Sequence, residues 1–268
     1  MRPIISRDIL EKLYREYNRR ELVSPDPIQY LWDYNDPLDR EIVGLISSSL
    51  AYGRVAQILN SVSSVIERMP RPSVFLKRAT AKSLRHTFDG FKHRFTTGDD
   101  LALMLYGAKR AIERHGSLQG HFLMGYNEND GTILPALESF VKGLLIDEDT
   151  GMSYLLPLPS RGSACKRLNL FLRWMVREDD VDPGGWSGVP ASKLVVPLDT
   201  HMDNICRTLG ITGRKQANMK TTIEITDFFR EMNPEDPVKY DFALTRLGIL
   251  EHTDLSSFLE KWRIKEVA

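Results

Sequence analysis

The chain has 268 residues, of which 42% are hydrophobic and 27% charged, with Lys and Arg (36) balanced by Asp and Glu (36). This composition excludes wholesale disorder and is sufficient for a substantial core, in one large helical domain or two small ones. Because the net charge is zero, no overall field attracts nucleic acid or an acidic membrane, although local charge still can.

The two cysteines, Cys165 and Cys206, allow at most one disulfide and indicate a reducing compartment. The N-terminus carries charges every few residues and lacks the apolar run of a signal peptide. No run in the sequence reaches the roughly 18 apolar residues that a membrane-spanning helix needs. We therefore expect a cytoplasmic protein with no membrane partner.

Apolar residues recur at helical spacing along most of the chain. Ser6 is placed to cap the first helix, and Gly116 to end the helix that begins at Asp99 and Asp100. Alternation typical of strands is scarce, and the best extended segment, LVVPL at residues 194–198, contains a proline that argues against a central strand. The predicted fold class is all-α. Helices are expected over residues 6–20, 38–52, 55–68, 99–115, 131–145, 165–177, 199–209, 220–232, 235–247 and 254–262.

Three segments are predicted to be loops, at residues 70–75, 126–132 and 178–192. The last of these is rich in Asp, Gly and Pro, so we expect a surface excursion between two helices. It contains Trp186, which either stacks on a nucleic-acid base or anchors the loop.

Two charged residues begin predicted helices. Lys166 follows a turn of small residues and falls in the first turn of an apolar helix, where the helix dipole disfavours a cation and so favours the neutral, nucleophilic amine. Asp199 follows an apolar run and is placed as an N-cap. Each alone would be a solvated lysine or a plain cap. Together they form the pair that amine attack on an acetal-like carbon needs, because a carboxylate can accept the proton or stabilise positive charge.

These residues also carry a resemblance. GSACK at residues 162–166, followed by an apolar helix and then VPLDTH at residues 196–201, resembles the helix–hairpin–helix base-excision DNA glycosylases, which include endonuclease III and the oxoguanine glycosylases. The resemblance implies a two-lobed all-α glycosylase-like unit over residues 1–268. Its helix–hairpin–helix and catalytic segment would span about 155–210, with a DNA cleft between the lobes.

The resemblance also assigns roles to individual residues. It implies that Lys166 forms a Schiff base with C1′ of a flipped-out nucleotide and that Asp199 assists. The backbone of the hairpin would hold a DNA phosphate, through Arg161, Gly162, Ser163 and Ala164.

Two further features take their roles from the same resemblance. His201 would help to position DNA or Asp199, unless it only forms a local hydrogen bond. Tyr52 and Arg54 end the segment EIVGLISSSLAYGR, which looks like the helix and turn that probe the DNA. The alternative for Tyr52 is packing at a helix junction. The segment YDFALTRLGI at residues 240–249 resembles the late helix of the family.

The sequence departs from this family in three ways. Ala164 stands where a second glycine is usual in the hairpin that presents amides to phosphate. The spacing from Lys166 to Asp199 is 199 − 166 = 33 residues, longer than in endonuclease III and similar to that of the archaeal oxoguanine glycosylases, which favours an oxidised purine as the substrate base. No cysteine quartet follows Asp199, so the iron–sulfur cluster of the endonuclease III branch is not expected.

The whole-chain pattern, including SSLAYGR and FKHRF, also resembles a widespread bacterial family of uncharacterised proteins distantly related to these glycosylases. The basic stretch at residues 77–95 interleaves cations with aromatic side chains, as in a phosphate-tracking surface or a plain solvated face.

We therefore expect a monomeric DNA glycosylase with AP-lyase activity that needs no metal or other cofactor. Its partner would be damaged duplex DNA carrying a flipped-out nucleotide. The alternatives are a non-catalytic nucleic-acid-binding protein on the same scaffold and a helical scaffold protein with no nucleic-acid role.

Overall fold

The computed structural model describes residues 5–145 and 154–250, so the predicted helix at 254–262 lies outside the described residues. The described chain is mostly helical, which confirms the all-α prediction. The α-helices are α1 (Arg7–Tyr17), α2 (Pro37–Ser49), α3 (Val55–Glu67), α4 (Pro72–Arg78), α5 (Ala81–Thr87), α6 (Gly98–His115), α7 (Leu118–Leu123), α8 (Leu134–Leu144), α9 (Lys166–Val176), α10 (Thr200–Thr208), α11 (Met219–Met232) and α12 (Asp241–Leu250). A two-stranded antiparallel hairpin, β1 (Lys92–His93) with β2 (Thr96–Thr97), and short 3-10 helices at Arg20–Leu22, Pro27–Asp33, Pro159–Arg161 and Ala191–Lys193 complete the described elements.

Each helix predicted within the described residues corresponds to an observed helix, although α12 starts at Asp241 and not at 235. The short helices α4, α5 and α7 and the hairpin were not predicted. The loop predicted at 70–75 is wrong from Pro72 onwards, because Pro72 is the first residue of α4. Proline favours that position, since the first turn of a helix does not use its backbone N–H.

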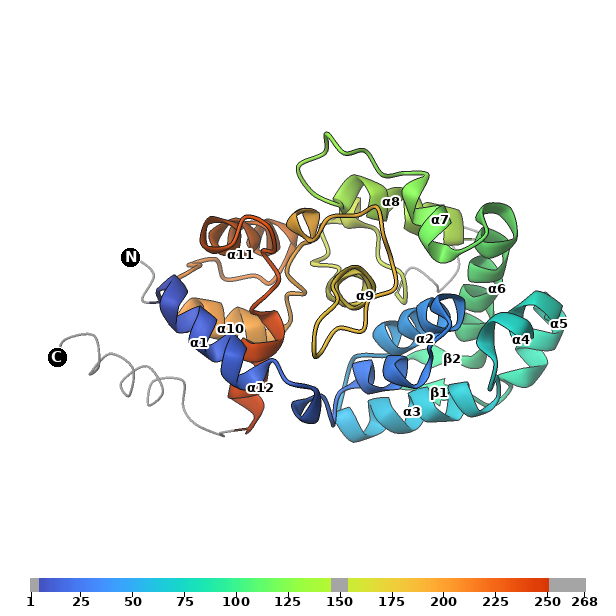
Figure 1. The fold of residues 1–268 in the computed structure, drawn as a ribbon. Coiled ribbons are helices and arrows are strands. Elements are labelled where there is room, and N and C mark those ends of the chain that lie inside the picture. Colours follow the sequence, from blue (N-terminus) through green and yellow to red (C-terminus); the bar gives the residue numbers. More distant parts are fainter. Residues whose placement is uncertain (1–4, 146–153, 251–268) are drawn as a thin grey trace.

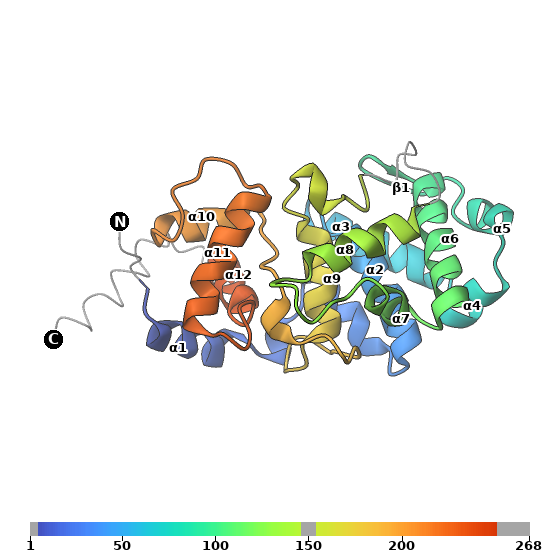
Figure 2. The ribbon, with the colours of Figure 1, turned by 90° about the horizontal axis from the view of Figure 1, so that it is seen from above.

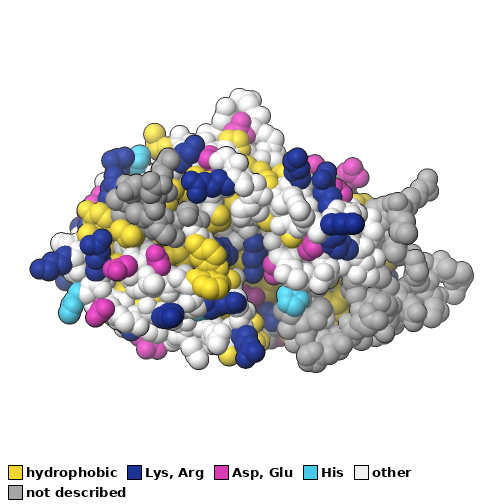
Figure 3. Space-filling view, turned by 180° about the vertical axis from the view of Figure 1, so that it is seen from behind, with side chains coloured by type: hydrophobic (Ala, Val, Ile, Leu, Met, Phe, Trp, Pro, Cys, Tyr) yellow, Lys and Arg dark blue, Asp and Glu magenta, His cyan; other side chains and the backbone are white. Residues whose placement is uncertain are grey.

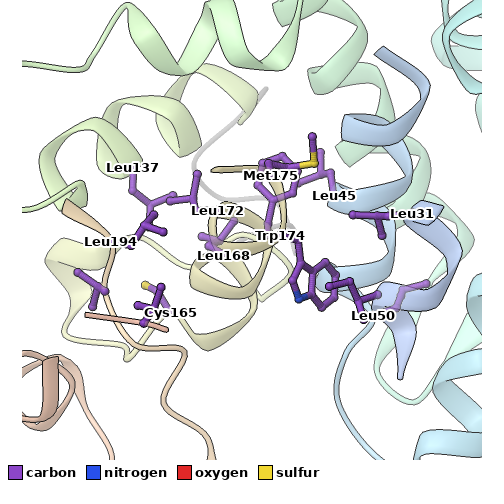
Figure 4. Packing of buried hydrophobic residues seen from close by; sticks show 14 of the residues in the cluster. Leu31, Leu45, Leu50, Leu137, Cys165, Leu168, Leu172, Trp174, Met175 and Leu194 are labelled. Carbon is purple, nitrogen blue, oxygen red and sulfur yellow. The ribbon is translucent and has the colours of Figure 1, made fainter. Parts of the chain in front are cut away.

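Helix α9 occupies the centre of the molecule. Helices α2 to α7 lie on one side of it, α1 and α10 to α12 lie on the other, and α8 lies above it in the view of Figure 1 (Figures 1 and 2). Side chains from α9 pack against α2 on one side and against α8 and the segment before α10 on the other (Figure 4). Gly44 allows α2 to approach α9 closely, because a Cβ at Gly44 would lie 3.3 Å from Phe171 and from Met175.

The segment at residues 178–192 is not the surface excursion that its composition predicts. Val181, Asp182, Trp186 and Val189 are buried. The ring of Trp186 packs among phenylalanines, and its Nε1 donates to Oε2 of Glu41 on α2 at 3.0 Å. Trp186 therefore anchors this segment and is not available to stack on a base.

Buried ion pairs join α9 to the segments around it. Arg173 on α9 pairs with Asp182 and with Asp241 at the start of α12. Arg177, one turn later, pairs with Asp182 and, through a 2.8 Å contact, with Asp236. Because buried charges are stable only when paired, this cluster explains how a segment rich in aspartate can turn inward.

Among the helices in the described residues, none is long and apolar enough to cross a membrane.

Candidate functional site

Lys166 is presented by a tight turn. Gly162 and Cys165 both have left-handed backbones, with φ of 78° and 49°, and α9 begins at Lys166. Its Nζ donates a 3.3 Å hydrogen bond to the carbonyl of Ala51, just after the end of α2. Burial raises the pKa of the neighbouring Cys165 thiol to about 11, so this thiol is a packing group and not a nucleophile.

Asp199 is the N-cap of α10, as the sequence predicts. Its Oδ1 accepts a 2.9 Å hydrogen bond from the backbone N–H of Met202, which fixes the carboxylate in orientation. Its Oδ2 lies 3.5 Å from the Nζ of Lys166, and the two side chains are 29% (Lys166) and 26% (Asp199) exposed. The structure thus brings the two predicted residues into one solvent-accessible ion pair.

This pair lies in a cleft of about 630 Å³. The cleft is formed mainly by α9 and by four segments around it: the turn between α2 and α3, the turn before α9, the segment leading into α10 and the start of α12. In the view from behind, Lys and Arg side chains lie on both sides of a hollow in the middle of the face (Figure 3). A volume of this size is typical of small-ligand sites.

The other predicted residues divide into two groups. Ser163, Ala164, His201 and Tyr52 line the cleft, whereas Arg161, Gly162 and Arg54 are exposed residues outside its lining. No described residue accepts a hydrogen bond from the backbone N–H of Ser163 or Ala164, while the N–H of Cys165 donates to Oγ of Ser163. Ser163 and Ala164 thus line the cleft without an acceptor for their backbone N–H groups among the described residues.

Tyr52 is held by its neighbours. Its hydroxyl donates to the carbonyl of His93 at 2.8 Å and contacts Oγ1 of Thr96 at 2.6 Å. The guanidinium of Arg167 lies over the Tyr52 and Tyr154 rings, at 4.9 and 4.8 Å from their centroids. These contacts agree with the alternative in which Tyr52 packs at a helix junction. Tyr52 also lines the cleft.

A protein family described as "Protein of unknown function (DUF2400)" matches residues 26–250. The chain belongs to the DUF2400 family. The match includes Lys166, Asp199 and all four segments that form the cleft. No curated protein and no solved structure matches the chain.

The DUF2400 chain has an exposed aromatic side chain beside the cleft that the sequence prediction did not single out. Phe95, at the tip of the hairpin, is 72% exposed and packs edge-on against Tyr154 at 6.0 Å. Arg94, which has a left-handed backbone, extends its side chain next to Gly53 on the cleft rim. The alternation of cationic and aromatic side chains in FKHRF, at residues 91–95, could have indicated this exposed aromatic residue with its neighbouring cation.

The cleft also contains a carboxyl group that the sequence prediction missed. Asp241 is buried, and its Oδ2 pairs with Arg173. Burial raises the pKa of Asp241 to about 6, against the attraction of Arg173 and with help from the negative charge of Asp199. Aspartate is common at helix starts, so the sequence did not indicate that Asp241 would be a buried carboxyl group in the lining of the cleft.

In the part of the chain that the structure describes, no group of three or more His, Cys, Asp or Glu side chains is arranged to hold a metal ion.

Proposed function

We propose that this DUF2400 chain is a DNA glycosylase with AP-lyase activity, built on a helix–hairpin–helix glycosylase-like scaffold, that removes a damaged base through a Schiff base on Lys166. The observation that carries the proposal is the 3.5 Å contact between Lys166 and Asp199 inside a cleft that can hold a nucleotide. An amine beside an oriented carboxylate is suited to attack on C1′ of a nucleoside.

In the proposed reaction the neutral Nζ attacks C1′, and the bond between C1′ and the base breaks. The base leaves with the electron pair and takes up a proton. Asp199 accepts the proton from the amine and stabilises the positive charge that develops on the sugar. Opening of the sugar ring gives an imine between Lys166 and C1′. Loss of a C2′ proton then expels the 3′ phosphate, and water releases the lysine.

Two features at the rim of the cleft support DNA as the partner. The N–H groups of Ser163 and Ala164 can bind a phosphate, since they have no acceptor among the described residues. Phe95 and Arg94 provide an exposed aromatic ring with an adjacent cation, which suits stacking on a base near a flipped nucleotide. Flipping costs a few kcal/mol, which such contacts would offset.

Borohydride trapping tests this proposal directly. Borohydride adds a hydride to the imine carbon, so a duplex with an abasic site or an oxidised guanine should become covalently linked to the wild-type protein. Lys166→Ala should give no adduct, whereas Lys220→Ala, a change at an exposed lysine on α11 outside the cleft lining, should give the wild-type amount.

Two results would overturn the mechanism. One is no adduct with wild type on any of these duplexes, and the other is an adduct that survives Lys166→Ala. Salt-dependent DNA binding without an adduct would indicate the non-catalytic nucleic-acid-binding protein instead.

A further inference from the structure

Three of the four large hydrophobic side chains that are exposed among the described residues lie at one edge of the cleft. These three are Phe95 (72% exposed), Tyr154 (45%) and Val55 (41%), and the fourth is Met124, at the end of α7. Val55 lines the cleft itself. Exposed apolar side chains that are scattered singly need no explanation, whereas a group of them beside a cleft marks a binding surface.

Ring contacts join these side chains into one surface, which we call the aromatic rim (Val55, Phe95 and Tyr154). The ring centroids of Phe95 and Tyr154 are 6.0 Å apart, and those of Tyr154 and Tyr52 are 5.4 Å apart. Tyr52 lines the cleft, as does Val55 shortly after it in the chain. The rim therefore leads from the tip of the hairpin to the wall of the cleft that holds Lys166.

The hairpin that carries Phe95 is fixed in place. The hydroxyl of Tyr52 donates to the carbonyl of His93 at 2.8 Å, and Nε2 of His93 donates to the carbonyl of Tyr52 at 3.0 Å. Nδ1 of His93 lies 2.9 Å from Oγ of Ser61 on α3. These bonds tie the hairpin to α3 and to the turn before it. A partner that binds at the rim therefore has little backbone to order, which favours binding.

The rim is surrounded by cations that have no acidic partner. The guanidinium of Arg94 lies over the ring of Phe95, at 5.6 Å from its centroid, and that of Arg167 over the ring of Tyr154, at 4.8 Å. Arg54, at the N-cap of α3, is exposed. No carboxylate of the described residues forms an ion pair with any of these three arginines. Aromatic rings beside unpaired cations suit a partner that combines flat rings with negative charge, as nucleic acid does.

The orientation of the two rings decides which form of nucleic acid fits. The planes of Phe95 and Tyr154 meet at 83°. Successive bases of a paired duplex are parallel, so they cannot lie flat on two rings that stand upright to each other. The bases of a splayed single strand turn independently, and such bases stack on aromatic side chains. The rim thus fits a strand whose bases are separated from their partners.

We propose that the aromatic rim binds unpaired bases next to the nucleotide in the cleft, so that the substrate is DNA that is single-stranded or locally unpaired around the damaged base. The inference rests on the proposed function for the choice of nucleic acid as the partner. It adds that a fully paired duplex is the poorer ligand, because its bases must first be unpaired, which a single strand does not require.

The test measures binding of three labelled probes to the full chain by fluorescence anisotropy. The probes are an oligothymidine of about 15 nucleotides, the same strand paired with its complement, and a strand of equal length built from stable abasic analogues. The last probe has the phosphates but offers no base to stack. Wild type should bind oligothymidine at least about tenfold more tightly than either of the other two. Charge alone predicts the opposite order for the duplex, because its charge density is higher.

Substitutions at Phe95 test the ring itself. Phe95→Ala should lower the affinity for oligothymidine by about 5-fold to 150-fold, as expected for loss of one stacked base, and leave binding of the base-free strand unchanged. Phe95→Tyr keeps the ring and should bind as wild type does, whereas Phe95→Leu should behave like Phe95→Ala. Met124→Ala is the matched control, because Met124 is 71% exposed and lies outside the cleft lining. All these side chains are exposed, so the variants should fold normally.

Four results would overturn the inference. They are duplex binding as tight as that of oligothymidine, equally tight binding of the base-free strand, the same loss in Phe95→Ala as in Met124→Ala, and no binding of any probe. Borohydride trapping is independent of these results. Trapping on an abasic duplex without a preference for oligothymidine would refute the role of the rim and leave the Lys166 chemistry intact. A preference that depends on Phe95, without trapping, would support the rim and refute the Schiff base.

Discussion

The indole Nε1 of Trp186 donates a 3.0 Å hydrogen bond to Oε2 of Glu41, and this bond ties the segment between α9 and α10 to helix α2. Glu41 also accepts the backbone N–H groups of Leu118 and Gln119 at the start of α7. One buried carboxylate thus connects α2, α7 and the segment that leads towards Asp199.

Trp186→Phe tests what this bond contributes. This variant keeps an aromatic ring among the phenylalanines and removes the indole N–H that donates to Glu41. The free energy of unfolding should therefore fall by about 1–2 kcal/mol. Trp186→Ala also removes the packed ring and should cost about 3–5 kcal/mol. Urea unfolding of both variants checks the order. No loss in Trp186→Phe would show that the hydrogen bond contributes nothing, and equal losses in the two variants would show that the packed ring contributes nothing.

The pH dependence of stability should reveal Glu41. Burial raises its pKa to about 7, although the hydrogen bonds from Leu118, Gln119 and Trp186 lower it. Because the folded pKa lies above the unfolded value, the folded state holds this proton more tightly. The group's contribution to stability is complete at pH values below about 4.5 and is lost as the pH rises through about 7.

The comparison that isolates this effect uses Glu41→Gln. The difference in free energy of unfolding between wild type and the variant should shift against wild type from pH 5 to 7, by up to about 1.4 kcal/mol per pH unit. His93 and His121, whose pKa values burial lowers, act in the opposite direction but are present in both proteins. A difference that is flat with pH would contradict the raised pKa.

Asp199→Asn should separate chemistry from folding. Asparagine caps a helix about as well as aspartate, and the ion pair with Lys166 is partly exposed, so stability should change by less than about 1 kcal/mol. The rate of borohydride trapping should fall by about 10²-fold to 10⁴-fold, because the group that accepts the proton is gone. A variant that folds normally and is trapped at the wild-type rate would exclude Asp199 from the reaction.

The sequence was sufficient to predict that Lys166 and Asp199 stand at helix starts, because helix starts depend on short-range signals. A turn of small residues before an apolar helix, and an aspartate after an extended run, each fix a helix start within a few residues. Their 3.5 Å separation depends on tertiary packing, which a spacing of 33 residues does not determine.

Residues whose role depends on distant partners were not predictable in the same way. Asp241 becomes a cleft residue through Arg173, 68 positions earlier, and nothing in the surrounding DFALTRLGI pattern distinguishes it from an ordinary first-turn aspartate. The segment at 178–192 was misassigned for the same reason. Its composition predicts exposure, but Arg173 and Arg177 neutralise Asp182 and Glu41 accepts from Trp186, so the segment turns inward.

The buried position of Arg173, Arg177 and Asp182 has a practical consequence for handling the protein. Their side chains are 5% exposed or less, so dissolved ions do not reach them and screen them little. Contacts between a cleft and DNA phosphates weaken steeply as salt displaces them. In the proposed complex with DNA, raising the salt concentration should therefore release the protein while its helices stay packed together, so that binding can be reversed without unfolding.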